Sequence, residues 1–290
     1  MHVTVLVRPG DPIAVVAPCG PYPAERFATG VDVATAAGHA LDIPADILRP
    51  WRYLAGDDDH RLAGLHRGLR SDGHAAVWLA RGGYGLTRLL SRIHLADAVP
   101  KPVIGFSDCT ALFAYLWKAG WPGALVHGPV VNSLPISDEA SREALWATLA
   151  GGGGSYPGES WRSGVAEGPV LGGNLALLAA LCGSPWQLDV RGAILVLEDV
   201  GEAPYRLDRM LQQLVTAGGL DGVAGVCFGD MVDCRLPPGA TWTLRDVLLD
   251  GLRDLHVPVL GDLPIGHGSR NHAFVWGRPG RIADGRLEIG

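Results

Sequence analysis

Residues 101–113 read KPVIGFSDCTALF, so Ser107 lies between a short apolar run and a helix-like segment. This order predicts a buried strand that turns sharply into a helix. Ser107 could cap that helix, because a serine hydroxyl accepts hydrogen bonds from the N–H groups of a first helical turn. Ser107 could also be a nucleophile, because such a turn exposes a hydroxyl at the carboxyl end of a sheet. This stretch alone leaves both interpretations open.

Strand and helix signals alternate through the first half of the chain. The apolar runs 13–18 and 75–80 are each followed by a helix-like segment, at about 24–38 and at 86–93. Buried strands that alternate with helices predict a doubly wound parallel sheet. In such a sheet, ligands bind beyond the carboxyl ends of the strands. The loops expected at that edge are 18–23, 81–85 and 106–110.

The chain is expected to form two α/β domains. Residues 151–168 are rich in glycine, serine and proline, which predicts a linker between domains at 1–150 and 169–290. In the second domain, 193–200 has the composition of a buried strand, and 203–219 has the apolar spacing of an amphipathic helix. We therefore expect an N-terminal doubly wound parallel-sheet domain that carries the nucleophile turn, followed by a C-terminal mixed α/β domain.

The composition is that of a soluble globular protein, since 48% of the 290 residues are hydrophobic and 19% are charged. A net charge of −6 without a run of Lys or Arg argues against a nucleic-acid partner. No apolar run approaches the roughly 20 residues that span a membrane, and no signal peptide is visible. The five cysteines include no C-x-x-C pair, which argues against a disulfide framework or a zinc site. We therefore expect a cytoplasmic protein without a metal.

Two features near Ser107 bear on its interpretation as a nucleophile. The glycine turn RGGYG at 81–85 could place an N–H group, together with that of Asp108, around a carbonyl oxygen as an oxyanion hole. It could also be an ordinary tight turn. Cys109 is a rival nucleophile, because the pKa of a thiol is lowered at a helix N-terminus. We favour Ser107, because the side chain of Cys109 should point along the helix.

A serine nucleophile needs a base and a group that orients the base. His127 and His267 are the candidate bases, since each follows an apolar run and precedes a glycine. Glu198 ends another apolar run, where a buried carboxylate needs a partner. Glu198 could orient a histidine or form a salt bridge with an arginine. Asp199 and Glu202 are nearby alternatives to Glu198.

Seven segments, spread over nearly the whole chain, together resemble one known family. They are PGDPIAVVAPCGP, GDDDHRLAGLHRGLRSDGHAAVWLARGGYG, KPVIGFSDCTAL, VHGPV, LGGNLALLAALCGSPW, AILVLEDVGEAPYRLDRMLQQL and LPIGHG. The resemblance is to the LD-carboxypeptidases, or muramoyl-tetrapeptide carboxypeptidases, serine peptidases that include the microcin C self-immunity hydrolases. Seven segments in the same order are far more specific than any single motif.

The resemblance implies a catalytic triad. Ser107 falls on the serine of the G-x-S-D motif, Glu198 on the glutamate that ends the LED strand, and His267 on the histidine of the closing GH. It also implies that the first domain supplies the nucleophile and the second supplies the base and its orienting acid. The oxyanion hole would come from the main-chain N–H groups of Asp108 and of Gly82 or Gly83. The residues expected to contact substrate are Arg81, Tyr84 and His127.

The function implied by the resemblance is hydrolysis of an LD-peptide bond. The substrate would be the small murein tetrapeptide, cut before its terminal D-Ala during peptidoglycan recycling. No cofactor is needed, and we expect a homodimer. One alternative is a microcin C-type hydrolase that acts on peptidyl or aminoacyl sulfamoyl-adenylates. A second is a non-enzymatic two-domain α/β binding protein, against which the missing signal peptide argues.

Overall fold

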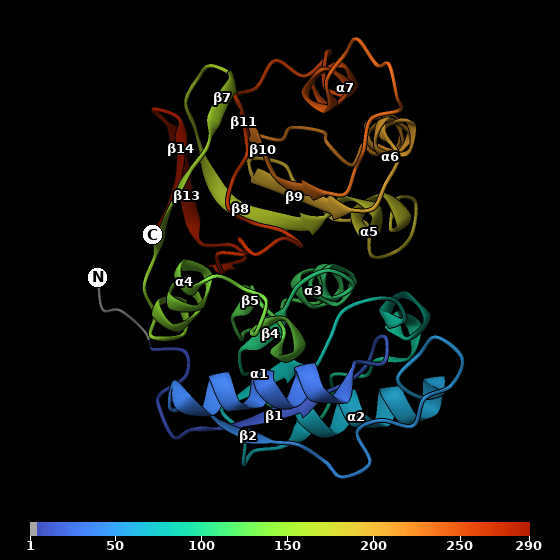
Figure 1. Cartoon of the computed structure of the whole chain (residues 1–290), viewed down its shortest axis with the longest axis vertical. Coiled ribbons are helices and arrows are strands. Elements are labelled where there is room, and N and C mark those ends of the chain that lie inside the picture. The colour runs from blue at the N-terminus through green and yellow to red at the C-terminus, as the bar shows by residue number, and fades with distance from the viewer. Residues whose placement is uncertain (1–4) are drawn as a thin grey trace. The chain divides into compact units, whose positions relative to one another are not determined.

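The computed structural model describes residues 5–290 (Figure 1). The chain forms two compact units. The first contains the residues up to Gly152 together with His272–Val275, and the second contains Gly153–Asn271 together with Trp276–Gly290. The segment 272–275, which falls in the second domain by sequence, is therefore part of the first unit.

The sheet of the first unit has six strands in the order β12-β5-β4-β3-β1-β2. They are β1 (Pro12–Val16), β2 (Ala40–Asp42), β3 (Ala76–Leu79), β4 (Val103–Gly105), β5 (Leu125–His127) and β12 (Phe274–Val275). All neighbours pair in parallel except β12, which is antiparallel to β5. The direction of the strand order reverses between β1 and β3, and ligands bind at the carboxyl ends of strands at such a point. The loops that follow β1 and β3 are at this position.

Helices cover both faces of this sheet. They are α1 (Ala24–Ala36), α2 (Asp58–Arg70), α3 (Cys109–Lys118) and α4 (Glu139–Leu149), with 3-10 turns η1 (Leu86–Arg88), η2 (Leu90–Arg92) and η3 (Val131–Ser133). Side chains of β1 alternate between the faces: Val15 shares a core cluster with Phe27 of α1, whereas Val16 contacts α2. Gly68 permits that contact, since a Cβ atom there would lie 2.8 Å from Val16. The prediction of a doubly wound parallel sheet is confirmed.

The segment 86–93 forms η1 and η2 rather than the predicted helix. The apolar pattern correctly indicated burial, because Leu86, Leu89 and Leu90 are all inaccessible to solvent. Tight 3-10 turns suit such a short segment. Its backbone is also fixed by a distant group, since the N–H of Leu86 donates to the Asp108 carboxylate. Nothing in the sequence near Leu86 indicates this hydrogen bond to Asp108.

The sheet of the second unit has eight strands in the order β6-β14-β13-β8-β9-β10-β11-β7. They are β6 (Gly154–Pro157), β7 (Glu159–Arg162), β8 (Ala166–Asn174), β9 (Ile194–Val200), β10 (Gly225–Val232), β11 (Val259–Gly261), β13 (Pro279–Ala283) and β14 (Arg286–Ile289). Strands β8 to β11 are parallel to one another, and the remaining pairs are antiparallel. Its helices are α5 (Leu175–Ala180), α6 (Pro204–Thr216) and α7 (Leu244–Gly251). The predicted mixed α/β domain is confirmed.

The structure differs from the linker predicted at 151–168. Residues there form β6, β7 and the start of β8. Their partners are distant in sequence, since β6 pairs with β14 and β7 with β11. The glycines serve this pairing: a Cβ atom at Gly153 would lie 2.2 Å from the carbonyl oxygen of Ile289. Glycine-rich composition therefore indicated close backbone approach, not a flexible connection.

Among residues 5–290, no helix combines the length and the apolar composition that crossing a membrane requires.

Candidate active site

Ser107 lies in the turn between β4 and α3 with a φ angle of +63°. This left-handed conformation is uncommon for residues other than glycine and costs on the order of 1 kcal/mol or more. Asp108, rather than Ser107, occupies the N-cap position of α3, and the Asp108 side chain makes no capping hydrogen bond. The N-cap position that the capping interpretation gives to Ser107 therefore belongs to Asp108. A strained serine at the carboxyl end of a central strand has the geometry of a nucleophile turn.

The glycine turn 81–85 packs directly against Ser107. A Cβ atom added to Gly82 would lie 2.7 Å from Cβ and 2.9 Å from Oγ of Ser107, so no larger residue fits without displacement. Within the part of the chain that the structure describes, the N–H groups of Gly82, Gly83 and Asp108 donate to no protein acceptor. Unengaged N–H groups in the two turns that pack together at Ser107 are the kind of donors that an oxyanion hole requires.

Gly82→Ala should therefore lower the reactivity of the Ser107 hydroxyl without unfolding the first unit. The added methyl group must move either the hydroxyl or the turn, and misplacement of a reacting group by about 1 Å costs roughly 100-fold in rate. The measurement is the rate at which a serine-directed phosphonate labels Ser107. Gly73→Ala is the matched control, since its Cβ would meet only Ser71 Oγ at 3.8 Å. Labelling of Gly82→Ala at the wild-type rate would contradict the close packing of Gly82 against Ser107.

The buried carboxylate of Asp108 connects the glycine turn to the Ser107 turn. Its Oδ2 accepts a hydrogen bond of 2.9 Å from the N–H of Leu86, the residue that directly follows the glycine turn. Burial raises the pKa of Asp108 to about 6, although the Leu86 hydrogen bond, the Cys19 thiol and the positive charge of Arg61 act in the opposite direction. The Asp108 carboxylate therefore holds the glycine turn in place and does not cap α3.

Arg61 of α2 is buried and holds three loops together, a role that sequence analysis missed. It shares the buried face of α2 with Leu65 and Leu69, and that spacing was the one available signal. Its Nη2 pairs with Asp58 at 2.5 Å. Its other donors reach the backbone oxygens of Gly56, Pro18 and Gly85. Arg61 thus fixes the loops that follow β1 and β3, including the end of the glycine turn.

Cys109 is unsuited to be the nucleophile. Its side chain is completely buried in the first turn of α3. Burial, followed by the negative charge of Asp108, raises the pKa of the Cys109 thiol well above its ordinary value. The expected lowering at a helix N-terminus is outweighed by these two effects. The thiolate, which is the nucleophilic form, is therefore scarce at neutral pH.

In the second unit, Glu198 and His267 form a close pair. Glu198 lies near the end of β9 and is fully buried, and its Oε2 lies 2.5 Å from Nδ1 of His267. Burial lowers the pKa of His267, but the charge and hydrogen bond of Glu198 outweigh it, so the pKa is raised above 6.5. When Nδ1 donates to the carboxylate, Nε2 is the basic nitrogen. The pair therefore has the arrangement of a general base and its orienting acid.

The loop that carries His267 is held by Asp230. A Cβ atom at Gly266 would lie 2.9 Å from Cβ of Asp230, and one at Gly268 would lie 2.8 Å from its Oδ2. Arg270 donates to Asp230 at 2.5 Å and to Asp262 at 2.7 Å. The absence of a side chain at both glycines beside His267 therefore allows Asp230 to pack closely against this loop.

The two alternative carboxylates make other contacts. Asp199 accepts a hydrogen bond of 2.8 Å from the N–H of Ala176 at the start of α5. Glu202 lies 3.5 Å from Arg206 on α6. The carboxylate that is hydrogen-bonded to His267 is that of Glu198.

Arg81 and Tyr84 flank the two glycines of the turn. The ring of Tyr84 is 45% exposed and lies near that of Tyr53, with ring centroids 6.0 Å apart. Arg81 is half-buried and donates to the backbone oxygen of Pro21, which joins the glycine turn to the loop after β1. Both side chains retain surface that a ligand could contact.

His127, which we expect to contact substrate, is the last residue of β5. Its side chain has no exposed surface and stacks on Phe274, with ring centroids 4.8 Å apart. Phe106, the residue before Ser107, meets its ring edge to face at 6.1 Å. His127 therefore packs against Phe106, the residue before Ser107, and a contact between His127 and substrate stays a prediction.

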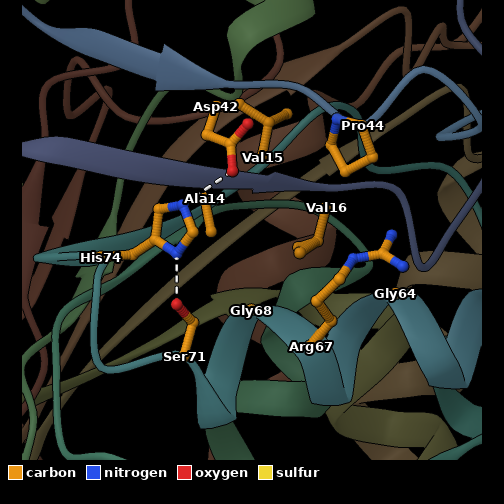
Figure 2. Close-up of a pocket in the computed structure, with 10 residues that line it drawn as sticks. All are labelled: Ala14, Val15, Val16, Asp42, Pro44, Gly64, Arg67, Gly68, Ser71 and His74. Carbon is orange, nitrogen blue, oxygen red and sulfur yellow. Dashed lines mark hydrogen bonds and ion pairs between the residues drawn. The ribbon is translucent and has the colours of Figure 1, made fainter.

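A pocket of about 340 Å³ lies between β1, the end of β2 and α2 (Figure 2). Within it, His74 bonds Asp42 at 2.8 Å and Ser71 at 2.6 Å, an order of groups like that of a triad. The side chain of Asp42 is 62% exposed, however, and Ser71 is an unstrained C-cap. We therefore interpret these hydrogen bonds as structural contacts that connect β2 to the end of α2. Across the described residues, no three His, Cys, Asp or Glu side chains are arranged to hold a metal ion.

Comparison with known proteins gives consistent matches. The model of the LD-carboxypeptidase N-terminal domain matches residues 13–128, and that of the LD-carboxypeptidase C-terminal domain matches 167–282. The murein tetrapeptide carboxypeptidase of Pseudomonas aeruginosa is 34% identical, over 91% of this chain and 92% of the relative. The muramoyltetrapeptide carboxypeptidase of Oxalobacter formigenes superposes with a TM-score of 0.84 at 26% identity, over 96% and 98% of the two chains. MccF in complex with glutamyl sulfamoyl guanosine has a TM-score of 0.89, over 99% and 98%, but its 21% identity supports the fold alone.

Proposed function

Because the chain belongs to the LD-carboxypeptidase family, we propose that it is a serine carboxypeptidase that releases the terminal D-Ala from murein tetrapeptide. The observation that carries this proposal is the strained turn at Ser107, with Gly82 packed against its hydroxyl. A serine exposed in this way can attack a carbonyl while neighbouring N–H groups bind the developing oxyanion. The names of the murein-cleaving relatives suggest the substrate class.

In the proposed mechanism, Ser107 attacks the carbonyl carbon of the third-position diamino acid. His267 takes the hydroxyl proton at Nε2, and Glu198 stabilises the imidazolium that results. The N–H groups of Asp108 and of Gly82 or Gly83 bind the oxyanion. His267 then protonates the departing amino group of D-Ala. Water, deprotonated by His267, releases the acyl group and restores Ser107. We place this reaction in cytoplasmic recycling of peptidoglycan peptides.

A substrate series tests the proposal through the stereochemistry of the leaving residue. A peptide ending in diaminopimelate-D-Ala should be cleaved, whereas the same peptide ending in L-Ala or in D-Ala amide should react at least about 100-fold more slowly. A site built to bind a terminal carboxylate leaves polar groups unpaired when that carboxylate is missing. The measurement is kcat/KM for each peptide, from mass spectrometry of the released residue. Similar values on all three would leave only a general serine hydrolase.

Two further arms separate the alternative functions. Cleavage of a peptidyl sulfamoyl-adenylate, with no cleavage of murein tetrapeptide, would indicate a microcin C-type hydrolase. Failure of a serine-directed phosphonate to label Ser107 would instead favour a binding protein. The expected outcome is labelling at Ser107 and cleavage of the tetrapeptide.

A further inference from the structure

Two arginines, Arg26 on α1 and Arg81 in the glycine turn, have hydrogen bonds only to neutral partners among the described residues. Arg26 contacts the side-chain amide of Asn132, and Arg81 donates to the backbone oxygen of Pro21. Within residues 5–290, neither guanidinium is paired with a carboxylate. The chain carries 24 Lys and Arg against 30 Asp and Glu, so acidic partners are abundant elsewhere. Two cations without a counterion in such a chain indicate a site for an anion.

The fold brings the two side chains together through η3. Gly30 lies one turn after Arg26 on the same face of α1, and a Cβ atom at Gly30 would lie 2.1 Å from the backbone oxygen of Val131. This close approach sets Arg26 over the neighbouring Asn132. The backbone N–H of Asn132 in turn donates to Ala80, the residue before Arg81, at 2.9 Å.

The pKa of Arg81 is lowered first by burial and then by the positive charge of Arg26. Like charges that are held close and half-buried repel each other, and an anion between them would relieve that repulsion. The first turn of α1 has no side-chain cap and adds positive partial charge, which the exposed Glu25 offsets in part. Each guanidinium has five N–H donors, so most remain for a planar carboxylate.

The position of Arg81 relates this anion site to the nucleophile. Arg81 precedes Gly82, and a Cβ atom at Gly82 would lie 2.9 Å from Ser107 Oγ. In a carboxypeptidase substrate, the free carboxylate is only one residue beyond the scissile bond, or about 3.8 Å of backbone. Arg81 is thus attached one residue from the glycine that packs against the nucleophile, which is about the separation between the scissile bond and that carboxylate.

We propose that Arg26 and Arg81 form the site that binds the C-terminal carboxylate of the substrate, and that this pair makes the enzyme a carboxypeptidase rather than an endopeptidase. This inference rests on the proposed function. It identifies one chemical group, the carboxylate of the departing residue, and two specificity-determining side chains. In this arrangement the N–H groups of Asp108 and of the glycine turn bind the oxyanion, while the arginines bind the carboxylate.

The test compares a free-acid peptide with its C-terminal amide for the wild type, Arg26→Met and Arg81→Met. Each substitution should lower kcat/KM on the acid by about 10- to 100-fold, the value of a hydrogen-bonded charge contact, mainly through KM. The value on the amide should change less than about threefold. Arg81→Lys should restore part of the preference, because it keeps the charge but not the planar fork. Arg92→Met is the control, since Arg92 is an exposed partner of Asp59.

The outcomes separate this inference from the function on which it rests. If the wild type prefers the acid and both methionine variants keep that preference, the arginine pair does not bind the carboxylate. An equal loss on acid and amide would assign the arginines to the structure of the turn and would also overturn the inference. If the wild type itself shows no preference for the acid, the carboxypeptidase function fails, and the inference fails with it.

Discussion

Ser107→Ala is expected to lower turnover of murein tetrapeptide by about 10⁴- to 10⁶-fold, the range for loss of a serine nucleophile. The substitution removes the oxygen that forms the acyl-enzyme in the proposed mechanism, while the turn and its glycine contacts remain. The thermal midpoint should stay close to that of the wild type or rise, because alanine adds no new contact. The measurements are release of D-Ala by mass spectrometry and the unfolding midpoint by calorimetry.

Cys109→Ala provides the matched control, two residues along the chain. Its thiol is buried and its raised pKa keeps it protonated, so its removal should leave most of the turnover. A modest loss of stability is expected from the deleted buried atom. Survival of activity in Ser107→Ala with loss in Cys109→Ala would reverse the assignment of the nucleophile.

His267→Ala and Glu198→Gln are expected to lower turnover by about 10³- to 10⁶-fold each. The members of a triad act as a unit, so the double variant should be hardly worse than the worse single variant. Glu202→Gln is the control, because Glu202 contacts Arg206 rather than His267. Severe damage from Glu202→Gln with a mild effect of Glu198→Gln would contradict the assignment of the orienting acid.

The pH dependence of kcat/KM provides a readout that a purely structural defect would not change. As the proposed base, His267 has to be neutral to accept the proton, and its pKa is raised above the ordinary value of 6.5. Activity should therefore fall as the pH decreases through a value above 6.5. In Glu198→Gln the larger of the two charges that raise this pKa is lost, only that of Asp199 remains, and burial continues to lower the pKa. The acidic limb of the residual activity should shift to lower pH, and an unchanged limb would argue against His267 as the base.

Several features of the fold could be predicted from local sequence, because their causes are local. The strand ending at Gly105, the turn and the helix from Cys109 follow from a short apolar run, small residues and an apolar helix in direct succession. Helix α6 begins at Pro204, as its proline and its leucine spacing indicated. Motif order over the whole chain also identified the family.

Other features could not be predicted from local sequence, because the residues that cause them are distant along the chain. The glycine-rich segment 151–168 forms strands whose partners, β11 and β14, lie about a hundred residues or more away. Segment 86–93 has a helical pattern, but its first N–H is held by Asp108. The burial of His127 was likewise not visible in its local sequence, because the return of β12 places Phe274 on its ring.

For the candidate site, the sequence by itself determined which residue types are present and the chemistry they allow: a serine in a strand-to-helix turn, a glycine turn, and a carboxylate and a histidine at strand ends. Only the tertiary structure decided which of them meet. It paired Glu198 with His267, placed Gly82 against Ser107, and surrounded Arg61 with three backbone oxygens. The physical reason is that hydrogen bonds and van der Waals contacts act over a few ångströms of space, whatever the separation along the chain. Burial and neighbouring charge, which set the pKa of each group, likewise exist only once the chain has folded.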